Sequence, residues 1–260
     1  MEHVLAVDIG GTKMEVGIVD TDGSILDRRR APSTGVADAE ELFARLTGLI
    51  DEVGAHAAMP SVTVCGVGCG GPMRRAGEAV SPINIAVWRD FPLRSRLAEH
   101  TGLPVHVDND AKALALGEAW KGRAQGVPNF IGMVVSTGVG GGIVLDGRLL
   151  DGDAGNAGHI GHVVVEPEGT DLHTHVQGVL EAEVSGTGIA ARTGRPAAEA
   201  DHAERIRAGT LVGRAVGSVA NLLDLQLAVV AGSVALGFGD TFFSAAQHEI
   251  DRVADLQHSA

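Results

Sequence analysis

Apolar residues follow two different spacings along the chain, and the change of spacing predicts alternating strands and helices. Residues 4–7 form a short apolar run and residues 15–19 alternate, as buried and half-buried strands do. Residues 39–55 instead place apolar side chains three or four positions apart, which is typical of an amphipathic helix. Further strands are expected at residues 61–67, 105–107 and 225–230, and further helices at residues 111–120 and 203–223. This order of elements predicts an α/β protein.

One succession of strands and turns occurs in both halves of the chain. In the first half, a strand is followed by Gly10-Gly11, a second strand, the turn Asp22-Gly23 and a third strand at residues 24–28. In the second half, a strand at residues 133–136 is followed by a turn of Gly138 and residues 140–142, a strand at residues 143–145 and the turn Asp146-Gly147. The repetition predicts two similar α/β lobes facing one another across a cleft, with bounds at residues 1–112 and 113–260. Coincidence among common hairpins is the alternative.

Composition narrows the class of protein. The 260 residues are 45% apolar and 20% charged, a mixture typical of a packed globular chain. The formal net charge of −13 opposes binding to a phosphodiester backbone, so we expect no nucleic-acid partner. Cys65 and Cys69 are too few for a disulfide framework, and no leader or long apolar span is evident. We therefore expect a cytoplasmic protein without a membrane partner.

Glycine, with 37 residues, is the most unusual component, and two glycine turns carry candidate chemistry. The segment Asp8-Ile-Gly10-Gly11-Thr12-Lys13 combines a carboxylate, exposed backbone amides, a hydroxyl and an ammonium group, which are the parts of a phosphate-binding turn. An ordinary glycine hairpin would explain this segment alone. The matching turn Thr137-Gly138-Val-Gly140-Gly in the second half favours a pair of turns that hold a triphosphate.

Two polar segments are candidates for the remaining chemistry. Asp108-Asn109-Asp110 joins a predicted strand to a predicted helix, where one residue could be the helix N-cap or a carboxylate kept ionised as a general base. His159-Ile-Gly-His162 precedes Val163–Val165 and so is expected at the start of a strand. Hydrogen-bonding histidines are one interpretation; with His173 and His175, a structural zinc site is the less favoured one.

These motifs, in this order, resemble the ROK (repressor, open reading frame, kinase) family of sugar kinases, over essentially the whole chain. The segments 8–13 and 136–142 look like its two phosphate motifs, and Gly70-Gly71-Pro72 and Ser81-Pro-Ile-Asn84 resemble its sugar-side loops. Asn109-Asp110 resembles the pair that binds sugar and carries the catalytic base. Ala157-Gly-His-Ile-Gly-His162 resembles the signature that closes the sugar pocket.

The resemblance implies a two-lobed, actin-like ATPase (ribonuclease H-like) fold with a duplicated domain and a central cleft. It also implies phosphorylation of a hexose at the 6-hydroxyl, with glucose as the best single candidate, ATP and Mg²⁺ as cofactors, and a homodimer. Asp110 would be the catalytic base. The residues implied in hexose binding are Gly71, Asn84, Asn109, Asp110, His159, His162 and Glu181; those implied in binding the nucleotide are Asp8, Gly10, Gly11, Thr12, Lys13, Thr137, Gly138, Gly140 and Gly232. Asp8 would also orient hydrated Mg²⁺.

The chain departs from the family pattern in three places. His159 stands where the family usually has Glu, which leaves the preferred hexose open. Leu172, Thr174 and Val179 stand at the positions of three zinc-binding cysteines, so we predict no zinc site. The second lobe is also expected to lack the family's last glycine-containing segment and helix.

Several alternatives stay open at this point. They are a weakly active or inactive sugar-binding protein, a sugar-responsive regulator, and a kinase for N-acetylmannosamine or N-acetylglucosamine. Polyphosphate in place of ATP is the alternative phosphoryl donor. The regulator is disfavoured because no helix-turn-helix segment precedes residue 1, and the inactive protein because Asp8, Asn109 and Asp110 are all present.

Overall fold

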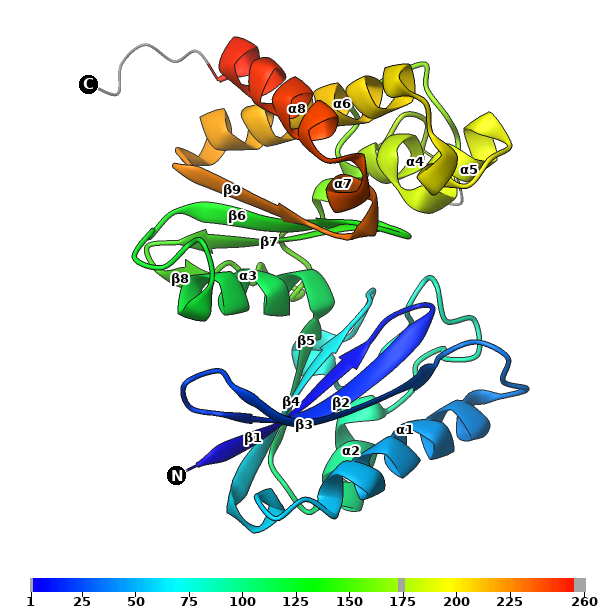
Figure 1. The fold of residues 1–260 in the computed structure, drawn as a ribbon, viewed down its shortest axis with the longest axis vertical. Helices are drawn as coiled ribbons and strands as arrows, with labels where there is room; N and C mark the ends of the chain where they lie inside the picture. The colour runs from blue at the N-terminus through cyan, green and yellow to red at the C-terminus, as the bar shows by residue number, and fades with distance from the viewer. Residues whose placement is uncertain (1, 173–175, 255–260) are drawn as a thin grey trace. The chain divides into compact units, whose positions relative to one another are not determined.

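The structure is a computed structural model that describes residues 2–172 and 176–254. The chain forms two compact units (Figure 1). Unit 1 comprises the residues up to 113 together with residues 151–156, and unit 2 comprises residues 114–150 and those from 157 onward. Each unit contains its own β-sheet and its own core.

Unit 1 is built on a five-stranded sheet with the order β3-β2-β1-β4-β5. The strands are β1 (His3–Ile9), β2 (Lys13–Asp20), β3 (Ile25–Pro32), β4 (Val62–Cys69) and β5 (Val105–Asn109). The first three strands form an antiparallel meander, whereas β4 is parallel to β1 and β5 is parallel to β4. The carboxyl ends of β1, β4 and β5 therefore lie at one edge of the sheet, the usual location of a ligand site in α/β proteins.

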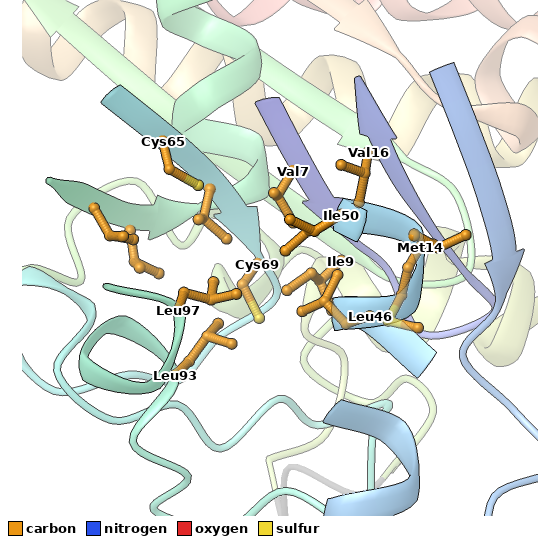
Figure 2. Close-up of a cluster of buried hydrophobic side chains, with 14 of the residues drawn as sticks. Val7, Ile9, Met14, Val16, Leu46, Ile50, Cys65, Cys69, Leu93 and Leu97 are labelled. Atoms are coloured by element: carbon orange, nitrogen blue, oxygen red, sulfur yellow. The ribbon is translucent and has the colours of Figure 1, made fainter. Parts of the chain in front are cut away.

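Helices α1 (Ala39–Gly54) and α2 (Leu93–Thr101) pack on this sheet and bury the apolar stripe that the sequence predicts. The Asp38 carboxylate accepts a hydrogen bond from the Glu41 amide at 2.9 Å, which caps the first turn of α1. Figure 2 shows side chains of α1 and α2 meeting those of the strands, with both cysteines among them. Short 3₁₀ turns occur at Met59–Ser61 and Arg75–Gly77.

Unit 2 is built on a four-stranded sheet with the order β8-β7-β6-β9. The strands are β6 (Phe130–Val135), β7 (Val139–Leu145), β8 (Arg148–Leu149) and β9 (Leu227–Ala231). Helix α3 (Asp110–Lys121) begins in unit 1 and packs on one face of this sheet, and α6 (His202–Leu223) lies on the other (Figure 1). The remaining helices are α4 (Leu180–Val184), α5 (Gly186–Thr193), α7 (Ser233–Phe238) and α8 (Asp240–Val253), with 3₁₀ turns at Ile160–His162 and Ala197–Glu199.

The duplication predicted from the sequence is confirmed at the level of strand pairing. In each sheet, an antiparallel meander of three strands is joined on the far side of its first strand by a later, parallel strand: β4 beside β1 and β9 beside β6. The two sheets thus share one pattern of strand pairing.

Two sequence predictions about local structure are wrong. Residues 140–142 lie inside β7 rather than in a turn, because they pair with residues 132–134 of β6. Their glycines instead allow close packing, since a Cβ on Gly141 would come within 2.8 Å of the Gly158 carbonyl oxygen. Val163–Val165 do not form a strand; Val164 makes only an isolated bridge to Val179, after the 3₁₀ turn Ile160–His162.

Helix α6 packs closely on α8 through a stripe of glycines. Gly209, Gly213 and Gly217 lie four residues apart on one face of α6, and a Cβ on any of them would crowd or overlap atoms of α8. Glycine therefore allows the two backbones to approach more closely than side chains would permit. No helix in the described ranges combines the length and the apolar character needed to cross a membrane.

Candidate functional site

The sequence-predicted site residues fall into one group in each unit. The unit 1 group comprises the segment 8–13, Gly71, Asn84 and Asn109-Asp110, and the unit 2 group comprises Thr137–Gly140, His159, His162, Glu181 and Gly232. Each group is described within its own unit.

The first glycine turn joins β1 to β2 and is closed by backbone hydrogen bonds. The Gly10 amide donates to the Lys13 carbonyl at 3.0 Å. Ser33 fixes the turn from outside, because its hydroxyl donates to the Gly10 carbonyl at 2.6 Å and its amide donates to the Thr12 carbonyl at 3.1 Å. Thr12 and Lys13 are exposed beyond this tie. The turn is therefore held in one shape, with an exposed Thr12 side chain and a Lys13 ammonium group that donates to the Glu15 carboxylate at 2.9 Å.

The sugar-side loop of unit 1 lies against this turn. A Cβ on Gly11 would come within 2.6 Å of the Asn84 Cβ, so only glycine allows the present contact. The loop is tied to the sheet edge because the Gly70 amide donates to the Ile9 carbonyl at 3.4 Å and the Ile83 amide to the Gly71 carbonyl at 3.1 Å. Gly11, Gly71 and Asn84 are thus brought together although they lie up to 73 positions apart in the sequence.

Asn109 and Asp110 lie at the same edge, where β5 ends and α3 begins. Register places Ile9, Cys69 and Asn109 side by side on β1, β4 and β5. The Asn109 side-chain oxygen accepts from the Ala111 amide at 3.0 Å and so acts as a cap of α3. The helix start packs directly on β4, since a Cβ on Gly68 would lie in contact with the Asp110 Cα at 3.4 Å. Asp110 is thereby placed in the first turn of α3, where the helix dipole favours a carboxylate.

The electrostatics of this edge are dominated by carboxylates. Partial loss of hydration raises the pKa of the Asp8 carboxyl, the negative charges of Asp110 and Glu15 raise it further, and Lys13 lowers it. Burial raises the pKa of the Cys69 thiol, with Asp110 and Asp8 adding to the effect. Cys69 is therefore a neutral packing residue, while the Asp8 carboxylate lies in a negative field that suits a divalent cation.

Lys112, two residues after Asp110, is fully buried. Its side chain anchors the segment 151–156. Its ammonium group donates to the Asp151 carboxylate at 2.5 Å and to the Gly155 carbonyl at 3.0 Å, and lies 3.4 Å from the Asp108 carboxylate. A buried ammonium group needs such partners to offset its lost hydration. The segment 151–156 is thus fastened beside the residues that begin α3.

The second glycine turn, in unit 2, is held by the first two residues of α5. The Ser136 amide closes the turn by donating to the Gly138 carbonyl at 2.9 Å. The Gly186 amide donates to the Ser136 carbonyl at 2.7 Å, and the Thr187 hydroxyl to the Thr137 carbonyl at 2.9 Å. Thr137 is exposed at the tip of this turn.

Glu181 and the histidine segment both contact the first residue of β7. The Glu181 Oε2 atom accepts a hydrogen bond from the Val139 amide at 2.7 Å. A Cβ on Gly161 would overlap the Val139 carbonyl oxygen, so the turn containing His159 and His162 packs directly on the same backbone. The two imidazole rings are 6.0 Å apart between centroids. Glu181, His159 and His162 thus gather around the second glycine turn.

Gly232 lies beside the same turn. Its φ of +104° belongs to the region that favours glycine, and a Cβ there would overlap the Val135 backbone. The neighbouring Ser233 hydroxyl is 2.9 Å from the Ser136 hydroxyl. All the predicted unit 2 residues therefore lie around one turn.

Possible metal sites were sought among the side chains that the structure describes. Within residues 2–172 and 176–254, no three His, Cys, Asp or Glu residues form a group that could hold a metal ion. His173, Thr174 and His175 lie outside the described residues. Val179, at one of the family's cysteine positions, is buried in an apolar environment and bridges Val164.

Three residues of this architecture were not identified from the sequence. They are Ser33, Lys112 and Thr187, each of which acts through a hydrogen bond to the backbone of a distant segment. Only Lys112 carries a signal, since a lysine within the apolar run of α3 is unusual; serine and threonine in loops are too common to single out.

Comparisons with known proteins agree with the resemblance. Residues 4–250 match the ROK family. A glucokinase from Halalkalibacterium halodurans is 39% identical over 190 residues, which are 72% of this chain and 57% of that protein. An N-acetylmannosamine kinase from Escherichia fergusonii is 35% identical over 250 residues, which are 90% of this chain and 84% of that protein.

A solved structure agrees as well. The ROK family glucokinase from Streptomyces griseus, determined in complex with glucose and AMPPNP, is similar with a TM-score of 0.82 and 27% identity, covering 97% of this chain and 90% of that one. The predicted fold class, an α/β fold of the actin-like ATPase type, is confirmed by this similarity and by the two sheets. The predicted enzyme class, a sugar kinase, agrees with the names of the relatives.

Proposed function

Because this chain belongs to the ROK family, we propose that it transfers the γ-phosphoryl group of ATP to the 6-hydroxyl of a hexose. Relatives named glucokinase and N-acetylmannosamine kinase support a hexose kinase as the broader class. We propose ATP as the phosphoryl donor, the 6-hydroxyl as the acceptor, and the residue roles that follow.

The observation that carries the proposal is the edge of the unit 1 sheet. A glycine turn suited to phosphate, a polar loop suited to sugar hydroxyls and an aspartate at a helix start meet there, through the contact of Gly11 with Asn84 and the pairing of β1, β4 and β5. A phosphate-binding turn alone would suit any nucleotide-binding protein. A carboxylate placed beside it favours transfer of the phosphoryl group to an alcohol.

Asp110 is assigned the role of general base. Its carboxylate accepts the proton of the hexose hydroxyl as that oxygen attacks the γ-phosphorus. We assign hexose binding to Asn84, Asn109 and the backbone of Gly71 among the residues of unit 1. Among those of unit 2, we assign it to Glu181, His159 and His162. Because Asn109 also caps α3, one residue links hexose binding to the placement of the base.

The triphosphate and Mg²⁺ are assigned to the two glycine turns and Asp8. The amides of Gly11 and Gly138, the hydroxyls of Thr12 and Thr137, and Lys13 are assigned to the phosphate oxygens. Gly10, whose amide closes its turn, and Gly140, in β7, shape the two turns, and Gly232 is assigned to the adenosine. Asp8 suits a hydrated Mg²⁺. Lost hydration, and then the charges of Asp110 and Glu15, raise the pKa of its carboxyl, and a cation would offset that charge repulsion. Bound Mg²⁺ would neutralise charge that develops on the phosphoryl oxygens.

Glucose is the proposed hexose, and N-acetylmannosamine is the second candidate because relatives over most of the chain are named for it. We propose to measure ADP release with ATP and Mg²⁺ against glucose, mannose, fructose, N-acetylmannosamine and N-acetylglucosamine. One hexose should give turnover well above the rate without sugar. Hexose-independent ATP hydrolysis, or no turnover with any of the five, would overturn the proposed function.

A further inference from the structure

The predicted phosphate turn of unit 2 is tied at both ends to one short segment, Glu181–Thr187. Gly186 and Thr187 hold the start of the turn through the carbonyls of Ser136 and Thr137. Glu181 holds its end, because its Oε2 atom accepts from the Val139 amide at 2.7 Å. The shape of the turn therefore depends on where this segment lies.

Helix α4, which carries Glu181, is itself fixed in place. Glu183 is fully buried, and its carboxylate accepts hydrogen bonds from the Thr170 amide and from the Arg207 guanidinium group. The Leu180 amide donates to the Val163 carbonyl at 2.8 Å. Glu181 therefore projects from an anchored helix, so that its carboxylate can restrain Val139.

The Glu181 carboxylate can accept further hydrogen bonds. Within the described residues, the Val139 amide is its one hydrogen-bond donor, and the side chain is only partly buried. A carboxylate accepts through two oxygens and about four lone-pair directions. Glu181 can thus hold the turn through one oxygen and accept a hexose hydroxyl through the other.

The histidine segment reaches the same residue. Gly161 packs against the Val139 carbonyl oxygen, and a Cβ on Gly158 would come within 2.5 Å of the Gly141 carbonyl oxygen. Both unit 2 segments assigned to hexose binding therefore contact the backbone that shapes the phosphate turn. The histidine segment therefore cannot move closer to that backbone without displacing it, because there is no space between them.

We propose that Glu181 is a positioning residue for the phosphate turn, and that it couples hexose binding to nucleotide binding. The inference rests on the proposed function and deepens it. Glu181 holds the turn in its binding shape before any hexose is present. A hexose hydroxyl on the same carboxylate restrains that carboxylate further, so hexose raises the affinity for nucleotide, and by linkage nucleotide raises the affinity for hexose.

The test is the affinity for nucleotide in the absence of hexose. A residue that only binds the hexose would not change this affinity. Calorimetric titration with Mg²⁺ and the non-hydrolysable analogue AMPPNP would compare wild type with Glu181→Ala and Glu181→Gln. Glu181→Ala should bind AMPPNP about fivefold more weakly or worse, because the Val139 amide loses its acceptor. Glu181→Gln retains an acceptor oxygen and should bind within about twofold of wild type.

Glu168→Ala is the matched control, since Glu168 is an exposed glutamate of the same unit. It should bind AMPPNP as wild type does. Adding saturating glucose, or N-acetylmannosamine if that sugar gives the higher turnover, should tighten AMPPNP binding to wild type about fivefold or more and leave binding to Glu181→Ala nearly unchanged.

Two results would separate the possible failures. If folded Glu181→Ala bound AMPPNP as tightly as wild type without hexose, Glu181 would not position the turn and the inference would be wrong, with the proposed function intact. If wild type itself bound no AMPPNP with or without hexose, the proposed function would fail and this inference with it.

Discussion

Gly11 is the residue at which the phosphate turn and the sugar-side loop meet. Alanine at this position would bring its Cβ within 2.6 Å of the Asn84 Cβ, so either the turn or the loop must move. Since both are assigned to ligand binding, Gly11→Ala should lower kcat/KM by about tenfold or more, in line with the effect of small misplacements on catalysis. Steady-state ADP release measures this loss.

Gly48 provides the control for that substitution. It lies within α1, and a Cβ there would meet nothing within 4 Å. Gly48→Ala should leave kcat/KM unchanged and stabilise the fold by about 0.5–1 kcal/mol, because alanine favours a helix. Equal activity of the Gly11→Ala variant and wild type would contradict the assigned role of this contact.

Asp8, which we assign to Mg²⁺ binding, is expected to lower stability when no cation is bound. Lost hydration and the charges of Asp110 and Glu15 raise the pKa of its carboxyl above the ordinary value of 3.8. Such a group contributes stability that is fully present below its unfolded-state pKa and lost as pH rises through its folded-state pKa. At neutral pH, and without a bound cation, we therefore expect ionised Asp8 to make a small unfavourable contribution to stability, since solvent reaches this exposed residue and screens its charge.

Asp8→Asn should accordingly be more stable than wild type at pH 7 while losing kinase activity. Its advantage should shrink as pH falls toward 3.8, because wild-type Asp8 then becomes neutral. Urea unfolding at several pH values without Mg²⁺ measures the effect, with the exposed Asp153→Asn as control. An Asp8→Asn variant that is less stable at pH 7 would show that the carboxylate is stabilised by its surroundings, contrary to our account.

At the scale of elements, the packing of α6 on α8 depends on glycine. A Cβ on Gly213 would overlap the Ala246 carbonyl oxygen and lie 2.9 Å from the Glu249 Cβ, and helix backbones cannot move apart locally. Gly213→Ala should lower the free energy of unfolding by about 1–3 kcal/mol, despite the better helix propensity of alanine. Denaturant unfolding measures this change.

Gly237 in α7 is the corresponding control, because a Cβ there would meet nothing within 4 Å. Gly237→Ala should be neutral or slightly stabilising. If Gly213→Ala were as stable as Gly237→Ala, the close approach of the two helices would not be a requirement of the fold.

The sequence predicted most of these elements because strands and amphipathic helices have distinct apolar periods. The strand at 4–7 and the helix at 39–55 are found within a few residues of their predicted bounds. Prediction was wrong where contacts distant in sequence decide the structure. Residues 140–142 form part of a strand because they pair with residues 132–134 of β6, and Val163–Val165 lack a neighbouring strand along their length.

At the scale of the whole molecule, each unit gathers residues from distant parts of the chain at one edge or turn. The candidate motifs could be predicted from their residue types, and the strand–turn–strand repeat indicated the duplicated sheets. The hydrogen bonds that fix these motifs could not be predicted from the sequence, because Ser33, Lys112 and Thr187 act through backbone groups that no local pattern identifies. The roles of the site residues remain predictions.

The most direct test concerns Asp110, whose position at the start of α3 carries the proposed chemistry. In Asp110→Asn, the amide cannot accept the hydroxyl proton, so turnover should fall by about 10²–10⁴-fold. Hexose affinity, measured by calorimetry, should stay within about threefold of wild type, and the exposed Asp153→Asn should retain full activity. An Asp110→Asn variant that phosphorylates hexose at the wild-type rate would contradict the account.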